Sequence, residues 1–208
     1  MGPMQPDGQA DIILASSSPR RRELLNLLGL SFQVLAPHLD EERMPGEKAA
    51  EYARRLARDK ARCIHATLPV PQAASAVVIA ADTVVAVDDQ VLGKPVDQAD
   101  ACAMLRSLSG RVHQVFTGLA LLGPATEYVT LVATDVEMKP LTDGEIEAYV
   151  ATAEPMDKAC AYAIQGGAAF MVRSLNGSYT NVVGLPMAEL EEALRELFGI
   201  QPFQHGAG

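Results

Sequence analysis

The feature that most limits the possible folds is a continuous apolar run in the middle of the chain. Residues 77–81 carry only aliphatic side chains, which is the pattern of a strand covered on both faces rather than on one. Covering both faces of a sheet requires a chain that can build several layers. The 208 residues, of which 49% are hydrophobic, suffice for one such domain and exclude a disordered chain.

Strands and helices are predicted to alternate irregularly around this run. We expect further strands at 12–15, 32–35, 112–122 and 128–138, and helices at 19–28, 47–68, 97–108, 143–150 and 186–198. Two hairpins are predicted, one through Asp88-Asp89 and one from 168–174 through Asn176-Gly177 to 179–183. This mixture indicates an α/β (α+β) fold with a mixed sheet. We expect one domain over residues 11–199, with flexible tails at 1–10 and 200–208.

Charge and cysteine content argue against several classes of protein. The chain has 17 Lys and Arg against 26 Asp and Glu, a net charge of −9, which disfavours sequence-independent binding to nucleic acid. Cys63, Cys102 and Cys160 are scattered, which favours a reducing cytoplasm over a zinc site or a disulfide framework. No apolar stretch approaches the roughly 20 residues that span a bilayer, and no signal-peptide pattern is present. We expect a cytoplasmic protein without nucleic-acid or membrane partners.

Consecutive arginines stand where a helix should begin. Ser18 is predicted to be the N-cap and Pro19 the first helical residue, which places Arg20, Arg21 and Arg22 in the first turn. The helix dipole disfavours cations at this end. An anion held there by the free backbone N–H groups and the guanidinium groups would account for them. The alternative is that the arginines are simply solvated.

Lys60 falls on the apolar side of its predicted helix. At about 100° per residue, Ala49, Ala53, Leu56 and Ile64 share one face, and Lys60 lies in the middle of it. A lysine there either extends to solvent along the apolar surface or points into a cleft that holds an anionic partner.

A single acidic residue interrupts the central apolar segment. Asp82 follows the run at 77–81, and Thr83 and further apolar residues follow it. A carboxylate at the end of a buried strand is costly unless it is paired, hydrogen-bonded or bound to a cation. The ends of strands are also where α/β proteins place their ligands. The alternative is an aspartate in a turn that ends the strand.

Weaker signals surround these residues. Asp40-Glu41-Glu42 could supply a metal-binding oxygen, although acidic loop runs are usually just solvated. Lys94 lies in a Gly-Lys-Pro segment that predicts a tight turn. Gln165 precedes two glycines, and its amide could donate and accept toward a nucleobase edge or belong to an ordinary loop. One acid with several bases suits phosphate chemistry on a divalent ion.

A series of segments, in order along residues 12–198, resembles the Maf family of nucleoside triphosphate pyrophosphatases. These segments are LASSSPRRRELL, LDEE, LARDKA, AADTVV, GKP, LSGRVHQVFTG, EPMDKACAYAIQG and NGSYTNVVGLP. The resemblance implies an elongated mixed sheet between two lobes with a central cleft, and commonly a homodimer. It implies hydrolysis between the α- and β-phosphates, giving a nucleoside monophosphate and pyrophosphate, with a divalent metal cation (Mg, Mn or Co).

The resemblance also implies roles for single residues. Asp82 resembles the catalytic base that takes a proton from the attacking water. The positions that govern substrate choice are matched by Arg20, Thr83 and Gln165. The phosphate-binding positions are matched by Ser16, Arg21, Lys60 and Lys94. Glu41, together with Asp82, matches the metal site.

The ADT and YAIQG segments further resemble the members that act on dTTP and UTP. A sister group that acts on 7-methyl-GTP has another residue after the aspartate and an acid in place of the glutamine, so Thr83 and Gln165 favour pyrimidine nucleotides. Cys160 and Ala163 depart from the glycines usual in the family and bear on base selectivity. Two alternatives stay open. One is a nucleotide-sensing regulatory protein, such as a septation inhibitor, since the family has been linked to cell-division arrest. The other is an inosine triphosphatase-type purine pyrophosphatase.

Overall fold

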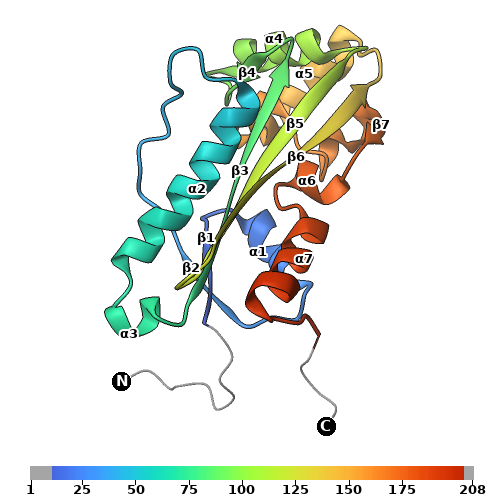
Figure 1. Ribbon diagram of the computed structural model, residues 1–208. Helices are drawn as coiled ribbons and strands as arrows, with labels where there is room; N and C mark the ends of the chain where they lie inside the picture. The colour runs from blue at the N-terminus through green and yellow to red at the C-terminus, as the bar shows by residue number, and fades with distance from the viewer. Residues whose placement is uncertain (1–10, 204–208) are drawn as a thin grey trace.

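The computed structural model describes residues 11–203, and within them the chain forms a seven-stranded mixed sheet (Figure 1). The strands are β1 (Ile12–Ala15), β2 (Phe32–Leu35), β3 (Val77–Val87), β4 (Gln90–Leu92), β5 (Val112–Leu122), β6 (Glu127–Met138) and β7 (Val172–Asn176). Their order is β2-β1-β3-β5-β6-β7, with β4 paired to β3. β1 runs parallel to β2 and β3, whereas the pairs from β3 through β5 and β6 to β7 are antiparallel. The predicted mixed α/β fold is confirmed.

Helices cover both faces of this sheet. The long helix α2 (Ala49–Thr67) lies along one face of β3 and β5. The opposite face carries α1 (Pro19–Asn26) and α7 (Met187–Phe198) toward one end and α4 (Gln98–Leu108) and α5 (Asp143–Ala151) toward the other (Figure 1). Shorter elements are α3 (Val70–Ala73), α6 (Tyr179–Val183) and the 3-10 helices η1 (Glu154–Asp157), η2 (Ala159–Ala161) and η3 (Gly167–Met171).

Local signals in the sequence set the ends of several elements. Ser18 caps α1 by accepting a hydrogen bond from the Arg21 amide, and Pro19 occupies the first turn. The Thr142 and Glu145 side chains form the predicted capping box of α5. Asp88-Asp89, both with positive φ, form the predicted turn between β3 and β4.

The apolar core is divided at the same level of β3 on both faces of the sheet. Odd-numbered residues of β3 up to Ala81 pack with α1 and α7, and those from Val85 onward pack with α4 and α5. Even-numbered residues pack under α2, again in two clusters that part midway along the strand. Long strands therefore connect two lobes, as the resemblance implies.

The second predicted hairpin is wrong. Residues 179–183 form α6 rather than a strand, because the Ser178 hydroxyl accepts a hydrogen bond from the Asn181 amide (3.2 Å) and caps a helix. The preceding strand starts later than expected, at Val172, since the chain before it is the 3-10 helix η3. The Asn176-Gly177 signal marks a turn, but not one between paired strands.

Residues 200–203 pack against the domain, although we expected the flexible C-terminal tail to begin at residue 200. Ile200 is 3% exposed and belongs to the cluster under α1 and α7. The Phe203 amide donates to the Leu28 carbonyl (3.1 Å). Residues 1–10 and 204–208 of the expected tails lie outside the described part of the chain. None of the described helices has the length and apolar character needed to cross a membrane.

Candidate active site

Asp82 and Thr83 are two consecutive polar residues in the middle of β3. They lie between the apolar clusters of the two lobes. Side chains alternate along a strand, so Asp82 faces α2 and Thr83 faces the opposite side. Asp82 lies in the middle of the strand rather than at its end, which corrects our expectation. The neighbouring strands explain how ligands could still reach it. β1 pairs with β3 only as far as Ile79, and β4 pairs only from Val85, so no strand in residues 11–203 pairs with this edge between them.

On the α2 face, Asp82 belongs to a buried ionic cluster. The Lys60 ammonium lies 2.5 Å from the Asp82 carboxylate and 2.9 Å from that of Glu41. Lys60 and Asp82 are each only 7% exposed. Lys60 thus points inward to anionic partners instead of extending to solvent. Burial raises the pKa of Asp82, against the opposing effects of Lys60 and Arg21.

A glycine in β5 allows α2 to approach the sheet at this point. Gly118 pairs with Asp82 across the sheet. A Cβ atom at Gly118 would lie 2.2 Å from the Ala53 carbonyl oxygen of α2. The helix backbone therefore packs directly on β5, and the register of α2 brings Lys60 over Asp82.

On the opposite face, a cavity of about 760 Å³ opens between the two lobes. Its size is that of a small-molecule site. Its lining includes five of the sequence-predicted residues: Arg20, Arg21, Thr83, Lys94 and Gln165. Lys94 is exposed and reaches the cavity from the segment after β4. That segment is not the tight turn we expected: residues 93–95 form no turn, and the Gly93 carbonyl accepts a hydrogen bond from the Cys160 amide (2.8 Å).

Arg21 lines the cavity and lies near enough to the ionic cluster to feel the charges of Asp82 and Glu41. Its guanidinium donates to the Gly184 carbonyl (2.7 Å) and to the Thr83 hydroxyl (3.0 Å), and it makes a longer contact with the Ser16 hydroxyl (3.5 Å). Burial lowers the pKa of Arg21, and the negative charge of Asp82 opposes this effect. Ser16 is buried at the end of β1. The predicted site residues therefore line the cavity, belong to the ionic cluster or, as Ser16 does, contact Arg21.

A network of hydrogen bonds links Thr83 to buried polar residues of β5, β6 and α6. The Thr83 and Thr117 hydroxyls lie 3.0 Å apart, and the Thr117 hydroxyl donates to the Asn181 carbonyl (3.0 Å). The side-chain amide of Asn181 in turn donates to the Val115 carbonyl (3.0 Å) and the Thr134 hydroxyl (2.9 Å). We did not predict Thr117 or Asn181 from the sequence. Thr117 stands between the apolar residues Val115 and Leu119 on the same side of β5, which was a usable signal.

The turn that presents Gln165 to the cavity is held by Glu154. Gly166 has φ +105°, a conformation that favours glycine. The next amide, that of Gly167, donates to both oxygens of the Glu154 carboxylate (3.2 and 3.1 Å). The Tyr149 hydroxyl donates to the same carboxylate (3.2 Å). Glu154, another residue that we did not single out, therefore fixes the backbone beside Gln165.

Cys160 and Ala163, the two departures from the family pattern, line the cavity together with Gln165. Cys160 has φ +53°, a left-handed conformation in which glycine is favoured. Its side chain is buried, and burial raises the pKa of the thiol. Ala163 is also buried and, like Cys160, lines the cavity.

The donor set of the ionic cluster is compatible with a hard divalent cation. Among residues 11–203, no three His, Cys, Asp or Glu side chains form a ready-made metal site. The Glu41 and Asp82 carboxylates both contact the Lys60 ammonium, so the cluster contains two carboxylates. Mg²⁺ is commonly bound through one or two carboxylates together with the phosphates of a substrate. The two carboxylates could therefore serve as ligands of such a cation.

The chain is similar to a known family and to several named proteins. The family described as Maf-like protein matches residues 11–197. The dTTP/UTP pyrophosphatase of Geobacter sulfurreducens is 52% identical over 188 residues, which cover 89% of this chain and 96% of that protein. That of Symbiobacterium thermophilum is 48% identical over 197 residues, or 95% and 98% of the two chains. The solved structure of the Staphylococcus aureus Ham1 protein matches with a TM-score of 0.44 and 16% identity, covering 91% of this chain and 98% of that one.

Proposed function

The chain belongs to the Maf family, and from this we propose that it is a nucleoside triphosphate pyrophosphatase acting on dTTP and UTP. The products are the nucleoside monophosphate and pyrophosphate. The observation that carries the proposal is the buried Lys60–Asp82 pair with Glu41 on one face of β3, together with a cavity on the opposite face that is lined by Arg20, Lys94 and Gln165. The names of the curated relatives support the same activity and substrates.

In the proposed reaction, Asp82 is the general base. It accepts a proton from a water molecule whose oxygen attacks the α-phosphorus, and the bond from this phosphorus to the oxygen bridging to the β-phosphorus breaks, so that pyrophosphate leaves. Burial raises the pKa of Asp82, which strengthens a carboxylate as a base, while Lys60 favours the ionised form. A divalent cation held by Glu41 and Asp82 would neutralise charge on the phosphate oxygens.

The remaining cations are proposed to bind the phosphate chain. Arg20 and Arg21 in the first turn of α1 line the cavity with Lys94, and Arg21 contacts the Ser16 hydroxyl. Arginine side chains and the free N–H groups of a helix N-terminus are suited to phosphate oxygens. This arrangement would place the base of the nucleotide in the cavity and its phosphates toward the open edge of β3.

Gln165 is proposed to recognise the base. Uracil and thymine present an O4 acceptor beside an N3–H donor, and a carboxamide can satisfy both. Cytosine reverses both polarities, so that a fixed glutamine would have to rotate. The turn held by Glu154 restricts the backbone from which Gln165 extends.

The deciding experiment is pyrophosphate release from dTTP, UTP, CTP, ATP, GTP and ITP, each with Mg²⁺, Mn²⁺ or Co²⁺. We expect turnover to be fastest with dTTP and UTP and to require the metal. Preference for ITP would instead indicate a purine pyrophosphatase. Nucleotide binding without turnover would indicate a regulatory protein, for which a carboxylate near the phosphates has no evident use.

We further propose a homodimer in the cytoplasm. The oligomeric state follows the family resemblance, and the location is favoured by three cysteines that are all free in the structure. Light scattering coupled to gel filtration tests the first proposal, and cell fractionation tests the second.

A further inference from the structure

Glu41 reaches the buried cluster from a loop without regular secondary structure. Residues 36–48 connect β2 to α2, and Glu41 itself is largely exposed. Its carboxylate nevertheless contacts the ammonium of Lys60, a buried residue of α2. Holding an exposed loop residue in such a contact costs conformational entropy. Something else in the structure must therefore restrict the backbone at Glu41.

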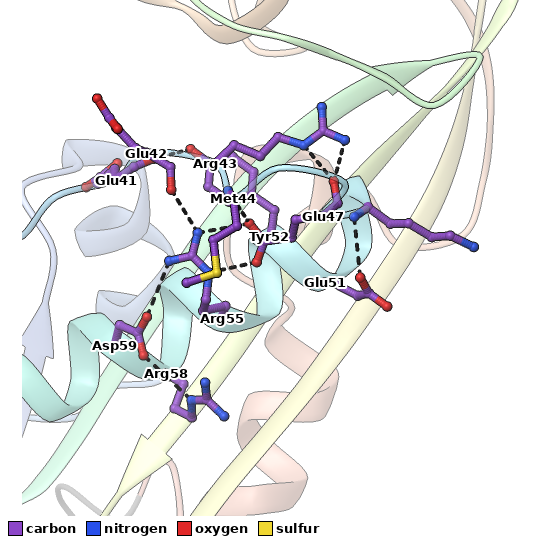
Figure 2. A network of polar contacts seen from close by, with 11 residues as sticks. Glu41, Glu42, Arg43, Met44, Glu47, Glu51, Tyr52, Arg55, Arg58 and Asp59 are labelled. Carbon is purple, nitrogen blue, oxygen red and sulfur yellow. Dashed lines mark hydrogen bonds and ion pairs between the residues drawn. The ribbon is translucent and has the colours of Figure 1, made fainter.

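Two side chains of α2 hold this backbone directly. The Tyr52 hydroxyl donates to the Glu41 carbonyl, and the Arg55 guanidinium donates to the Glu42 carbonyl (2.9 Å). Figure 2 shows both side chains extending from the helix toward the loop. Tyr52 and Arg55 are three positions apart, so they project from the same side of the helix.

Arg55 is itself fixed in place by a second contact with the loop. Its Nε and Nη2 atoms bind the two carboxylate oxygens of Glu47 at 2.7 and 2.9 Å, the forked geometry of a strong ion pair (Figure 2). The two side chains are 15% and 9% exposed. The Glu47 carboxylate also accepts a hydrogen bond from the Met44 amide (3.1 Å). One guanidinium therefore joins the helix to the loop on both sides of residues 43–46.

We propose that Arg55, assisted by Tyr52, is a positioning residue that fixes the loop so that the Glu41 carboxylate reaches Lys60 beside Asp82. The simpler alternative is that the Arg55–Glu47 pair only stabilises the start of α2. The kinetic part of the proposal rests on the proposed function, whereas its structural part does not.

The structural part is tested on the full chain without nucleotide or metal. Hydrogen exchange is measured for peptides covering residues 39–47 in wild type, Arg55→Gln, Arg55→Lys and Tyr52→Phe. Arg62→Gln is the matched control, because Arg62 lies on the same helix and makes a similar forked pair with Glu127 (2.7 and 2.7 Å) on β6. We expect faster exchange of this loop in Arg55→Gln and less change in Arg55→Lys and Tyr52→Phe, with wild-type exchange in the control. Unchanged exchange in Arg55→Gln would overturn the proposal.

The kinetic part uses a double-mutant cycle with Glu41→Gln. Arg55→Gln alone should lower kcat/KM about 10- to 100-fold, the usual effect of removing a group that orients a site ligand. In the Glu41→Gln background it should change kcat/KM by less than about twofold, since the two changes then remove the same contact. Arg55→Lys should be intermediate, because lysine cannot form the fork. Equal effects of Arg55→Gln in both backgrounds would overturn the proposal. A wild-type protein without pyrophosphatase activity would contradict the proposed function, while hydrogen exchange would still decide the role of Arg55.

Discussion

The two faces of β3 are built differently at one level of the strand. On the α2 face, Gly118 brings the helix backbone onto the sheet, and Asp82 is enclosed with Lys60 in a tight ionic cluster. On the other face, the helices separate into two lobes, and Thr83 lines a cavity large enough for a ligand. Two neighbouring residues, Asp82 and Thr83, thus face a closely packed ionic cluster and a cavity, respectively. We interpret the first face as the place of the reaction at the α-phosphorus, and the cavity on the second as the place where the base is recognised and the phosphate-binding cations meet the nucleotide.

The largest expected effect comes from Asp82→Asn, which removes the proposed base and keeps the side-chain volume. We expect turnover to fall by roughly 10²- to 10⁴-fold, the usual contribution of general-base catalysis, with a further loss if the metal is displaced. Initial rates of pyrophosphate release measure this, and calorimetry checks that nucleotide still binds. A variant that keeps more than about a tenth of the wild-type rate would exclude the role of Asp82.

Gly118→Ala tests the close approach on the α2 face. The added Cβ would lie 2.2 Å from the Ala53 carbonyl oxygen, and neither backbone can move cheaply. We expect the free energy of unfolding to fall by about 1–3 kcal/mol, or more, as for other overpacked sites. Activity should fall as well, because α2 carries Lys60. Gly144→Ala is the control, since nothing lies within 4 Å of the corresponding Cβ. Equal urea midpoints for the two variants would contradict this account.

The smallest effect is expected from Glu154→Gln, on the cavity face. A glutamine presents an amide N–H group to the Gly167 N–H in place of one carboxylate oxygen, so the turn beside Gln165 should loosen. We expect the preference for UTP over CTP to fall about 2- to 10-fold, which corresponds to the net value of one or two hydrogen bonds. Tyr149→Phe, which removes only the hydroxyl bound to the same carboxylate, should have a smaller effect. A lower melting temperature with an unchanged preference would indicate a purely structural role.

Much of the site could be predicted because its signals are local. Lys60 stands out against the helical period of its neighbours, and Asp82 interrupts an apolar run. The residues that support them depend on contacts between distant segments. Arg55 lies on the polar side of its helix. One of its partners is the Glu42 carbonyl, in a loop whose sequence has neither helical nor strand periodicity. The second hairpin was mispredicted for a different reason, because the Ser178 cap outweighed the β propensity of the residues after it.

The most direct test of the division between the two faces compares Lys60→Ala with Gln165→Glu. The value of kcat/KM is measured for UTP and for CTP in each variant and in wild type. Lys60→Ala should lower both values by a similar factor and leave their ratio unchanged, because Lys60 lies with Asp82 and Glu41 on the face away from the cavity. Gln165→Glu should change the ratio by roughly 5- to 150-fold, since it places an oxygen opposite O4 and leaves a polar contact unpaired. A ratio that changes with Lys60→Ala, or that stays constant with Gln165→Glu, would contradict the account.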